Sequence, residues 1–546
     1  MRSCIRGAVI ALVLMSASPV VHGDLVDDGL RVTEIMYNPI DGGDFEYLEF
    51  FNAGDGALDL AGVQFVVGIV FTVPAGTSLA SGEYLVITKN LDAFVSKYGG
   101  GLRAIGDFEG TSLKNSGEQI VVWDSASATI MDFEYNDGGE WPFRADGQGS
   151  ALERIDNSDD FGDPETWCDS VQFNGSPGRA GLAPSLGVVI NEVLTHTDSP
   201  LEDAIELFNP TIFSFDISGW FLSDAGGADR RKFRIPDGTT IGPDEYLVYY
   251  ERDFNFNNPL VDFALSSVED QVHLAQDSQS GQVTIFADSV QFGGVANSIS
   301  FGRHQTSAGV DFTTLRELTF GSVGLDTLEN FRTGAGAPNS DPLVGPIVIN
   351  EIMYHPPDVG GLDDRANEYI ELHNISDQAI ELWDPIGGSL EQKGWRLRRA
   401  VDFEFAEGTT IPPEGFLLVV SFDPVVEPDK LTAFRATYGL GPETPIVGGW
   451  GINERLNNSG ERVRLNRPDE PTPTPNMDVA RIVIDEVFYR DDDPWPDEAD
   501  GEGVSLERID AAAHGNEPLN WSASGPTPGA INIASQNHTG PLWSVY

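Results

Sequence analysis

Short stretches of alternating apolar and polar residues, separated by Gly and Pro, run along most of the chain. Alternate residues of EYIELHN (Glu368–Asn374) fall on opposite faces of an extended strand, so Glu368 and Glu371 lie on opposite faces. The 60 Gly and 34 Pro of the 546 residues, with strand-like runs about every 8–12 residues, are typical of sandwiches and barrels. Helices are expected only near Leu91–Tyr98 and Asp429–Tyr438. The pattern therefore predicts an all-β fold.

Five landmarks recur three times in the same order, which identifies an internal repeat. The opening strand reads VTEIMYNP, INEVLTHT and INEIMYHP, and its glutamates Glu34, Glu192 and Glu351 are 158 and 159 residues apart. A second strand (EYLEFFN, DAIELFN, EYIELHN), a turn entering an apolar strand (GTSLASGEYLVI, GTTIGPDEYLVY, GTTIPPEGFLLV) and a polar turn (LKNSGEQIVV, LSSVEDQVHL, LNNSGERVRL) follow. The copies close on SPGRAG, GAGAPN and TPGAIN, and the first and third carry LERID before the close, where the second has SFGRH.

The module boundaries fall in Gly-, Pro- and Ser-rich stretches. We expect modules at residues 24–182, 186–339 and 346–533, followed by a C-terminal tail at 534–546. Each module is long enough to bury its own two-sheet core. The linkers are short, which predicts a beaded, semi-rigid rod of three sandwiches.

Residues 1–23 have the layout of a secretory signal peptide. Arg2 and Arg6 precede an apolar run at Ala8–Met15, and small residues lead to a cleavage position after Gly23. The run is shorter than the roughly 20 apolar residues that span a bilayer, and no later segment resembles a transmembrane helix. We therefore expect the mature protein outside the cytoplasm, secreted or at the cell surface.

The chain is strongly acidic, with 86 Asp and Glu against 32 Lys and Arg, a formal charge of −54. Removing the signal takes away two arginines and no acid, which makes the charge −56. This sign repels phosphate backbones and anionic lipid, so nucleic acid is excluded as a partner. Only Cys168 remains after cleavage, so core burial must stabilise the modules without disulfide bonds within the chain.

The ordered landmarks resemble the lamin-tail domain, especially its bacterial secreted versions. The resemblance is carried by INEIMYHP…EYIELHN, the GW pairs at Gly219-Trp220 and Gly394-Trp395, the GTTIPPEGFLLV and LNNSGERVRL strands, and the LER…TPGA ending. It covers nearly the whole mature chain in three copies. The resemblance implies an immunoglobulin-like β-sandwich and a role in interaction or scaffolding. A fold does not by itself assign a function.

Acidic residues at fixed places in the repeat have two interpretations. They are either calcium ligands, or hydrogen-bond acceptors that fix turn backbone at strand ends. The set comprises Glu34, Glu46, Glu49, Glu192, Asp203, Glu206, Glu351, Glu368 and Glu371. A separate acidic loop, DDDPWPDEADGEG, is a second calcium candidate or a solvated loop, with candidate ligands Asp491, Asp493, Asp497, Asp500 and Glu502.

Other site chemistry has little support. None of the histidines pairs at a zinc-ligand spacing, although His355 and His373 share a module with Glu351. No nucleophile elbow, phosphate loop or dinucleotide fingerprint is found, so we expect no enzyme and no certain cofactor. Trp220 and Trp395 are expected in the core, whereas Trp141, Trp450 and Trp495 lie in loops, where they either stack on sugars or pack over a sandwich end.

Two functions therefore compete, and a third has weaker support. The first is a non-catalytic secreted or surface protein that binds an extracellular protein, matrix or envelope partner through loops. The second is a glycan-binding or enzyme-accessory array that uses loop tryptophans and calcium. A hydrolase with an unrecognised carboxylate site is the third. The sequence does not define the oligomeric state.

Overall fold

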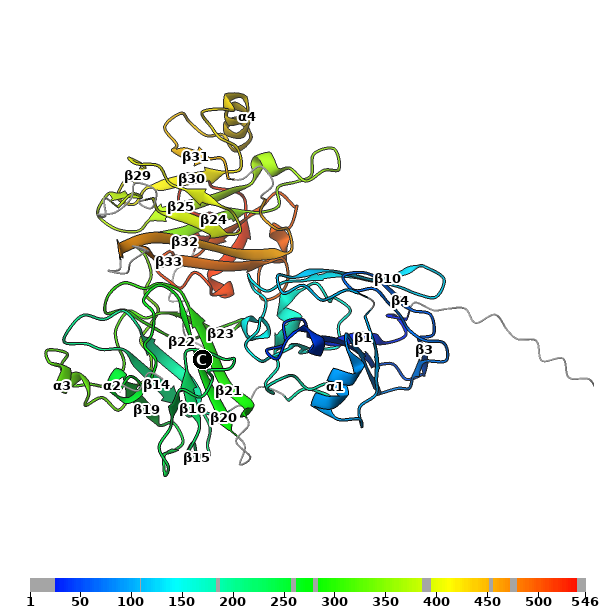
Figure 1. Cartoon of the computed structure of the whole chain (residues 1–546). Helices are drawn as coiled ribbons and strands as arrows, with labels where there is room; N and C mark the ends of the chain where they lie inside the picture. Colours follow the sequence, from blue (N-terminus) through cyan, green and yellow to red (C-terminus); the bar gives the residue numbers. More distant parts are fainter. Residues whose placement is uncertain are drawn as a thin grey trace, which may run out of the picture. The chain divides into compact units, whose positions relative to one another are not determined.

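The computed structural model describes residues 25–108, 110–182, 187–256, 262–277, 283–384, 394–450, 455–471 and 479–537 (Figure 1). The predicted signal at 1–23 and residues 538–546 of the predicted tail lie outside the described residues. The chain forms two compact units. The first comprises Met1–Tyr135, Glu153–Trp167 and Pro177–Arg179, and the second comprises Asn136–Leu152, Cys168–Ser176 and Ala180–Tyr546.

The first repeat forms two mainly antiparallel sheets and a short ribbon. The larger sheet, β12-β11-β1-β2-β7-β8, contains β1 (Leu30–Met36), β2 (Tyr47–Asn52), β7 (Tyr84–Thr88), β8 (Ala104–Gly106), β11 (Leu152–Arg154) and β12 (Trp167–Asp169). The smaller sheet, β10-β9-β4-β5, contains β4 (Gln64–Val67), β5 (Phe71–Thr72), β9 (Glu118–Trp123) and β10 (Thr129–Tyr135). The ribbon pairs β3 (Leu58–Asp59) with β6 (Ser78–Leu79), and the helices are η1 (Gly43–Phe45), α1 (Leu91–Tyr98), η2 (Phe143–Ala145) and η3 (Pro164–Thr166).

The second repeat has the same plan, without a counterpart of β8 among its described residues. Its larger sheet, β19-β14-β13-β22-β23, contains β13 (Val189–Leu194), β14 (Ala204–Phe208), β19 (Tyr246–Tyr250), β22 (Ser300–Thr306) and β23 (Gly309–Thr314). The smaller sheet, β17-β16-β20-β21, contains β16 (Phe221–Ser223), β17 (Phe233–Arg234), β20 (Asp270–Asp277) and β21 (Val283–Phe292). The ribbon pairs β15 (Phe215–Asp216) with β18 (Thr240–Ile241), and the helices are α2 (Glu251–Phe254) and α3 (Leu328–Phe331).

The third repeat restores the full set of strands. Its larger sheet, β31-β30-β25-β24-β34-β35, contains β24 (Ile347–Met353), β25 (Tyr369–Asn374), β30 (Phe416–Val420), β31 (Ile446–Gly448), β34 (Ser505–Arg508) and β35 (Trp521–Ser524). The smaller sheet, β28-β27-β32-β33, contains β27 (Arg396–Arg399), β28 (Phe403–Glu404), β32 (Gly460–Pro471) and β33 (Val479–Arg490). The ribbon pairs β26 (Ile380–Glu381) with β29 (Thr410–Ile411), and the helices are η4 (Arg365–Asn367), α4 (Pro428–Tyr438), η6 (Asp497–Ala499), η7 (Pro518–Asn520) and α5 (Ile533–Asn537).

The structure confirms the predicted all-β sandwich fold, with a separate apolar core in each of the second and third sandwiches. The third core includes Ile352, Ile370, Leu397, Trp395 and Val463, and the second includes Val193, Ile205, Leu222, Trp220 and Val272. Buried side chains of the first sandwich include Ile35, Leu48, Phe65 and Ile120. These cores hold the apolar residues of the alternating stretches, and Trp220 and Trp395 are core residues as expected.

Both expected helices are present, at α1 and α4, but the expectation that they are the only helices is wrong, because the short helices α2, α3 and α5 also form. In the third sandwich, Phe434 and Tyr438 of α4 pack against Tyr369 of β25 at ring-centroid distances of 6.0 and 5.2 Å. The first sandwich has the equivalent trio of Tyr47, Phe94 and Tyr98. The helix therefore covers the outer face of the larger sheet. Among the helices of the described residues, none is long and apolar enough to cross a membrane.

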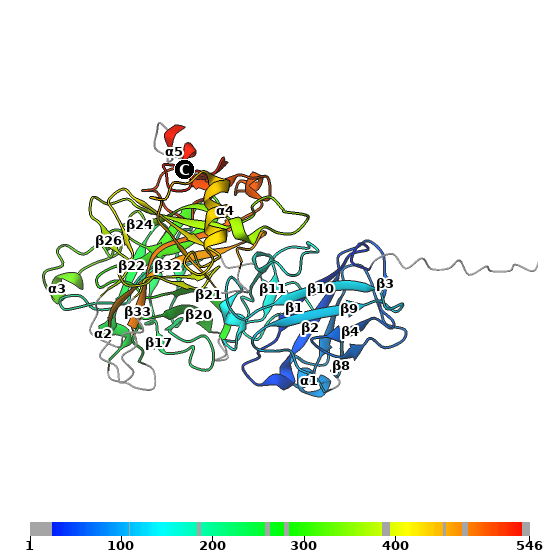
Figure 2. The ribbon, with the colours of Figure 1, turned by 90° about the horizontal axis from the view of Figure 1, so that it is seen from above.

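The expectation of a beaded rod is wrong for the second and third sandwiches, which pack against each other within the second unit (Figures 1 and 2). A parallel bridge joins Gly294 to Ile482, and His514 Nε2 lies 2.8 Å from Asp311 Oδ2. Burial alone would raise the pKa of Asp311, but the His514 contact lowers it to about 2. Linker length did not indicate this contact, because residues more than 180 positions apart form it.

Candidate functional site

A β-bulge in each opening strand places two buried glutamates side by side. The register shifts between Val32 and Glu34 in β1, and the same shift occurs in β13 and β24. Beyond it, the opening-strand glutamate pairs directly with the second-strand glutamate, as Glu34 with Glu49, Glu192 with Glu206, and Glu351 with Glu371. All six side chains are at most 1% exposed. We call each pair, with the groups that bind it, an acid junction.

Two donors bind the second-strand glutamate of every acid junction. The residue at the bulge supplies one donor, from Thr33 Oγ1 to Glu49 (2.8 Å), Asn191 Nδ2 to Glu206 (2.6 Å) and Asn350 Nδ2 to Glu371 (2.8 Å). The closing turn supplies the other through a backbone N–H, from Gly178 (2.5 Å), Ala337 (3.3 Å) and Gly529 (2.5 Å). The carboxyl groups therefore attach the end of each repeat to its beginning, across 129 to 158 residues.

Burial dominates the electrostatics of these junctions. Desolvation raises the pKa of Glu49 to about 8 and that of Glu206 to about 8, despite the hydrogen bonds they accept. It raises the pKa of Glu351 to about 7, and burial with the charge of Glu351 raises that of Glu371 well above its usual range. A third acid, Glu507, pairs with Glu351 in the third sandwich, where Gly302 faces Glu192 in the second. The second copy, which lacks the LER motif, therefore lacks this third acid.

The remaining recurrent acids fix the polar turn. Glu46, Asp203 and Glu368 accept the backbone N–H of Leu113 (2.8 Å), Leu265 (3.3 Å) and Leu456 (3.1 Å), respectively. Glu46 also binds Lys89 Nζ at 2.8 Å. Of the two interpretations of the recurrent acids, the structure therefore shows the second, in which carboxylates accept hydrogen bonds from turn backbone.

An asparagine at the end of the second strand, or directly after it in the second repeat, holds the adjacent turns of every repeat. Asn374 Nδ2 donates to the carbonyl oxygens of Gln378 (2.7 Å), Ile411 (3.0 Å) and Pro412 (3.0 Å), and its Oδ1 accepts the N–H of Ser376 (3.0 Å). Asn52 and Asn209 make the equivalent bonds.

Replacing Asn374 by Ala is expected to destabilise the third sandwich by about 1–3 kcal/mol, because buried carbonyl groups lose their donor. Urea unfolding measures this change. Gln378→Ala, at an exposed neighbouring side chain, is the control and is expected to stay within about 0.5 kcal/mol of the wild type. Equal effects of the two substitutions would contradict the assigned role of Asn374.

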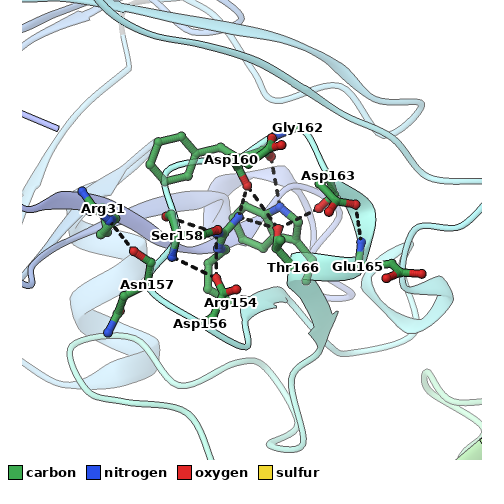
Figure 3. A network of polar contacts seen from close by, with 12 residues as sticks. Arg31, Arg154, Asp156, Asn157, Ser158, Asp160, Gly162, Asp163, Glu165 and Thr166 are labelled. Carbon is green, nitrogen blue, oxygen red and sulfur yellow. Dashed lines mark hydrogen bonds and ion pairs between the residues drawn. The ribbon is translucent and has the colours of Figure 1, made fainter. Parts of the chain in front are cut away.

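The arginine of LER organises a different loop in the first sandwich (Figure 3). Arg154, with its side chain only 2% exposed, donates to Asp156 Oδ1 (2.9 Å), Ser158 Oγ (2.5 Å) and the Asp160 carbonyl (2.6 Å). Asp160 Oδ1 in turn accepts the Gly162 N–H at 3.1 Å. The buried Arg154 guanidinium thus supplies the positive charge that balances the acidic residues of this loop.

The five predicted calcium ligands are spread along the acidic loop between β33 and β34. Asp493 and Glu502 are exposed, and Asp497 starts η6. Asp500 pairs with His355 Nδ1. Burial raises the pKa of the Tyr354 phenol, and the charges of Asp500, Asp491 and Asp497 raise it further. Within the described residues, the five predicted ligands form no group whose ligand atoms all lie within 4.8 Å of one another.

Sequence reasoning missed one group of three side chains that could together bind a metal ion. The ligand atoms of His355, Asp358 and Asp363 lie within 4.8 Å of one another, the one group of this kind in the described part of the chain. A search for zinc-ligand spacings between histidines could not find it, because only one ligand is a histidine. The available signal was HPPDVGGLD, in which a Gly-Gly turn separates Asp358 from Asp363.

Two of the three loop tryptophans are not surface platforms. Trp450 and Trp495 are each 3% exposed and belong to the third core, where Trp495 lies 6.0 Å from Trp521 between ring centroids. The sugar-stacking interpretation is therefore wrong for these two rings, because the loops fold over the end of the sandwich. Trp141 is half-buried.

A comparison with protein families supports the sandwich fold of the first two repeats. The lamin tail domain family matches residues 27–160 and 183–294, so the predicted resemblance is confirmed for the first two sandwiches. The third sandwich lies outside this match but has the same strand order. A crystal structure of a DUF4876 family protein from Bacteroides thetaiotaomicron is similar at 12% identity over 47% of this chain and 90% of that chain, with a TM-score of 0.21. No curated protein matches the chain.

Proposed function

We propose that the chain is a non-catalytic structural or interaction protein that acts outside the cytoplasm, at the cell surface or after secretion. We propose that the third sandwich is also of lamin-tail type and that all three belong to the bacterial secreted type of this domain. The sandwiches bind an extracellular or envelope partner through loops at their ends. One observation carries this proposal. Glu49, Glu206 and Glu371, whose raised pKa values make them natural acid–base candidates, are at most 1% exposed and are bound by closing turns, where no substrate reaches them.

Reporter hydrolysis tests the non-catalytic part. The purified chain is expected to release no product from ester, phosphate and glycoside reporters above the rate of a heat-denatured sample. Turnover above that rate would contradict the proposal. Glu371→Gln, which removes a buried acid, then serves as the diagnostic variant, because an enzyme using the acid junction would lose that turnover.

Fractionation of cells of the natural host tests whether the protein is exported. The signal-like residues 1–23 support release of a mature chain that begins at Asp24. Mass spectrometry of the N-terminus is expected to show this end in the envelope or extracellular fraction. An intact Met1 end confined to the cytoplasm would overturn the assignment.

A glycan-binding array is the second candidate, and the partly accessible Trp141 is the observation that favours it. Affinity electrophoresis against a polysaccharide panel distinguishes the two functions. The glycan function requires retardation that Trp141→Ala abolishes, whereas the first proposal expects none. Trp450→Phe is the control, because that ring is buried in the core.

A further inference from the structure

One end of the third sandwich brings a histidine and two carboxylates together across a tight turn. Val359 and Leu362 pair across Gly360-Gly361, whose φ angles of 67° and 77° favour glycine. The turn places Asp358 and Asp363 on its two sides. Their carboxylate oxygens and a His355 ring nitrogen lie within 4.8 Å of one another, and His355 Nε2 lies 3.7 Å from Asp358 Oδ1.

The orientation of the imidazole suits a metal ligand. His355 Nδ1 pairs with Asp500, and the backbone holds the partners in place through a parallel bridge and a 3.1 Å bond from Gly501 N–H to the His355 carbonyl. A carboxylate on one ring nitrogen fixes the tautomer and directs the lone pair of the other outward. Here the other nitrogen faces Asp358, at a separation too long for a hydrogen bond.

Three buried polar atoms, of a residue in the group and of two residues on which its acids act, have no hydrogen-bond partner among the described residues. They are Tyr354 Oη, Glu368 Oε1 and Asp363 Oδ1, and the side chains of Tyr354 and Glu368 are 1% and 0% exposed. The negative charge of Asp363 acts on Glu368, and the negative charge of Asp500 acts on Tyr354. A buried oxygen without a hydrogen-bond partner calls for an ion or an ordered water, and Asp363 Oδ1 belongs to the group itself.

The first sandwich has a cation beside the counterpart of Glu368. There Lys89 Nζ lies 2.8 Å from Glu46 Oε1 and neutralises the counterpart of Glu368. The third sandwich has Ser421 in place of that lysine, and its hydroxyl donates to the Arg365 carbonyl instead. Arg455 binds Asp363 through Oδ2 at 3.1 Å, which leaves Oδ1 without a donor.

We propose that His355, Asp358 and Asp363 bind a divalent transition-metal ion such as Zn²⁺, with Asp500 positioning the histidine. An imidazole with two carboxylates is a transition-metal donor set, whereas Ca²⁺ selects oxygen ligands. Zn–N and Zn–O bonds of about 2.0–2.2 Å place two ligand atoms roughly 3.4 Å apart in a tetrahedral site, close to the 3.7 Å found here. Three protein ligands leave a fourth position for water or for a side chain of a partner. This inference does not rest on the proposed function.

The test is calorimetric titration of the chelator-treated full chain with ZnCl₂ at pH 7. The wild type is expected to bind one Zn²⁺ saturably. His355→Asn is expected to weaken binding at least about tenfold, and Asp500→Asn about tenfold. His355→Asn suits the fold, because the first repeat has Asn38 at this place. Asp493→Asn, which removes an exposed acid of the neighbouring loop, is the control and is expected to bind as the wild type does.

Co²⁺ gives an independent readout, because its visible absorption reports a nitrogen-containing coordination sphere. The bands are expected in the wild type and the control and are expected to be absent in His355→Asn. No saturable Zn²⁺ binding, or equal binding by His355→Asn, would overturn the proposal. A Ca²⁺ site of similar affinity that is insensitive to His355→Asn would also overturn it, since the ion would then sit on the acidic loop.

Discussion

Replacing Arg508 by Met is expected to destabilise the third sandwich by about 3–5 kcal/mol, the usual result of removing one partner of a buried ion pair. Arg508 is 0% exposed and donates to Asp485 Oδ2 (2.6 Å) and to the carbonyls of Ile349 (3.0 Å) and Ala513 (2.6 Å). Asp485 also accepts the Ile349 N–H at 2.8 Å. The substitution therefore leaves a buried carboxylate without its counter-ion at the place where β24, β33 and β34 meet.

The second sandwich supplies a matched control. Arg303 binds Asp288 at 2.6 Å and the Ile190 carbonyl at 2.7 Å, but its side chain is 24% exposed. Arg303→Met is therefore expected to cost less, because water solvates the carboxylate that remains. Hydrogen exchange measured by mass spectrometry separates the two effects, since protection should fall in peptides of the affected sandwich.

A double-mutant cycle distinguishes charge from packing. Asp485→Asn combined with Arg508→Met is expected to cost less than the sum of the single changes, because neither variant residue is a buried unpaired charge. Strict additivity would show that the guanidinium acts through packing alone. A loss below about 1 kcal/mol for Arg508→Met would contradict the role of the pair.

The repeat predicted the fold because local patterns determine it. Alternation in EYIELHN places Ile370 and Leu372 in the core, and both helices occupy the inter-strand slot where they were expected. The bulge in the opening strand was not predictable from alternation alone. INEIM reads as a regular strand, whereas the extra residue at Asn350 directs both Ile349 and Ile352 into the core.

The site depends on contacts that sequence spacing does not encode. The pairing of Glu351 with Glu371 follows from adjacent strands, but the donor from Gly529 comes from a turn 158 residues beyond Glu371. Likewise, Trp495 sits in a Pro- and Asp-rich loop with the composition of an exposed segment. It is buried because that loop folds back beside Trp521.

The chain is expected to become less stable as the pH rises from about 5 to about 8. The folded-state pKa values of Glu49, Glu206 and Glu368 are each about 8 and that of Glu351 is about 7, all raised by burial from a usual 4.5. Between the two values, the folded state holds more protons than the unfolded state. Stability therefore falls with increasing pH across this window, and each pKa difference of 1 corresponds to about 1.4 kcal/mol.

Thermal unfolding between pH 5 and pH 8 measures how the midpoint temperature changes with pH. One substitution tests whether the acid junction causes this change. Glu371→Gln keeps the shape of the side chain but cannot ionise, so its midpoint is expected to exceed that of the wild type at pH 8 and to approach it at pH 5. Glu407→Gln removes one exposed acid and controls for the general repulsion in a chain of charge −54. A midpoint that rises with pH in the wild type, or equal slopes in the two variants, would mean that the junction carboxyl groups are ionised in the folded state, held by the N–H donors of the closing turns.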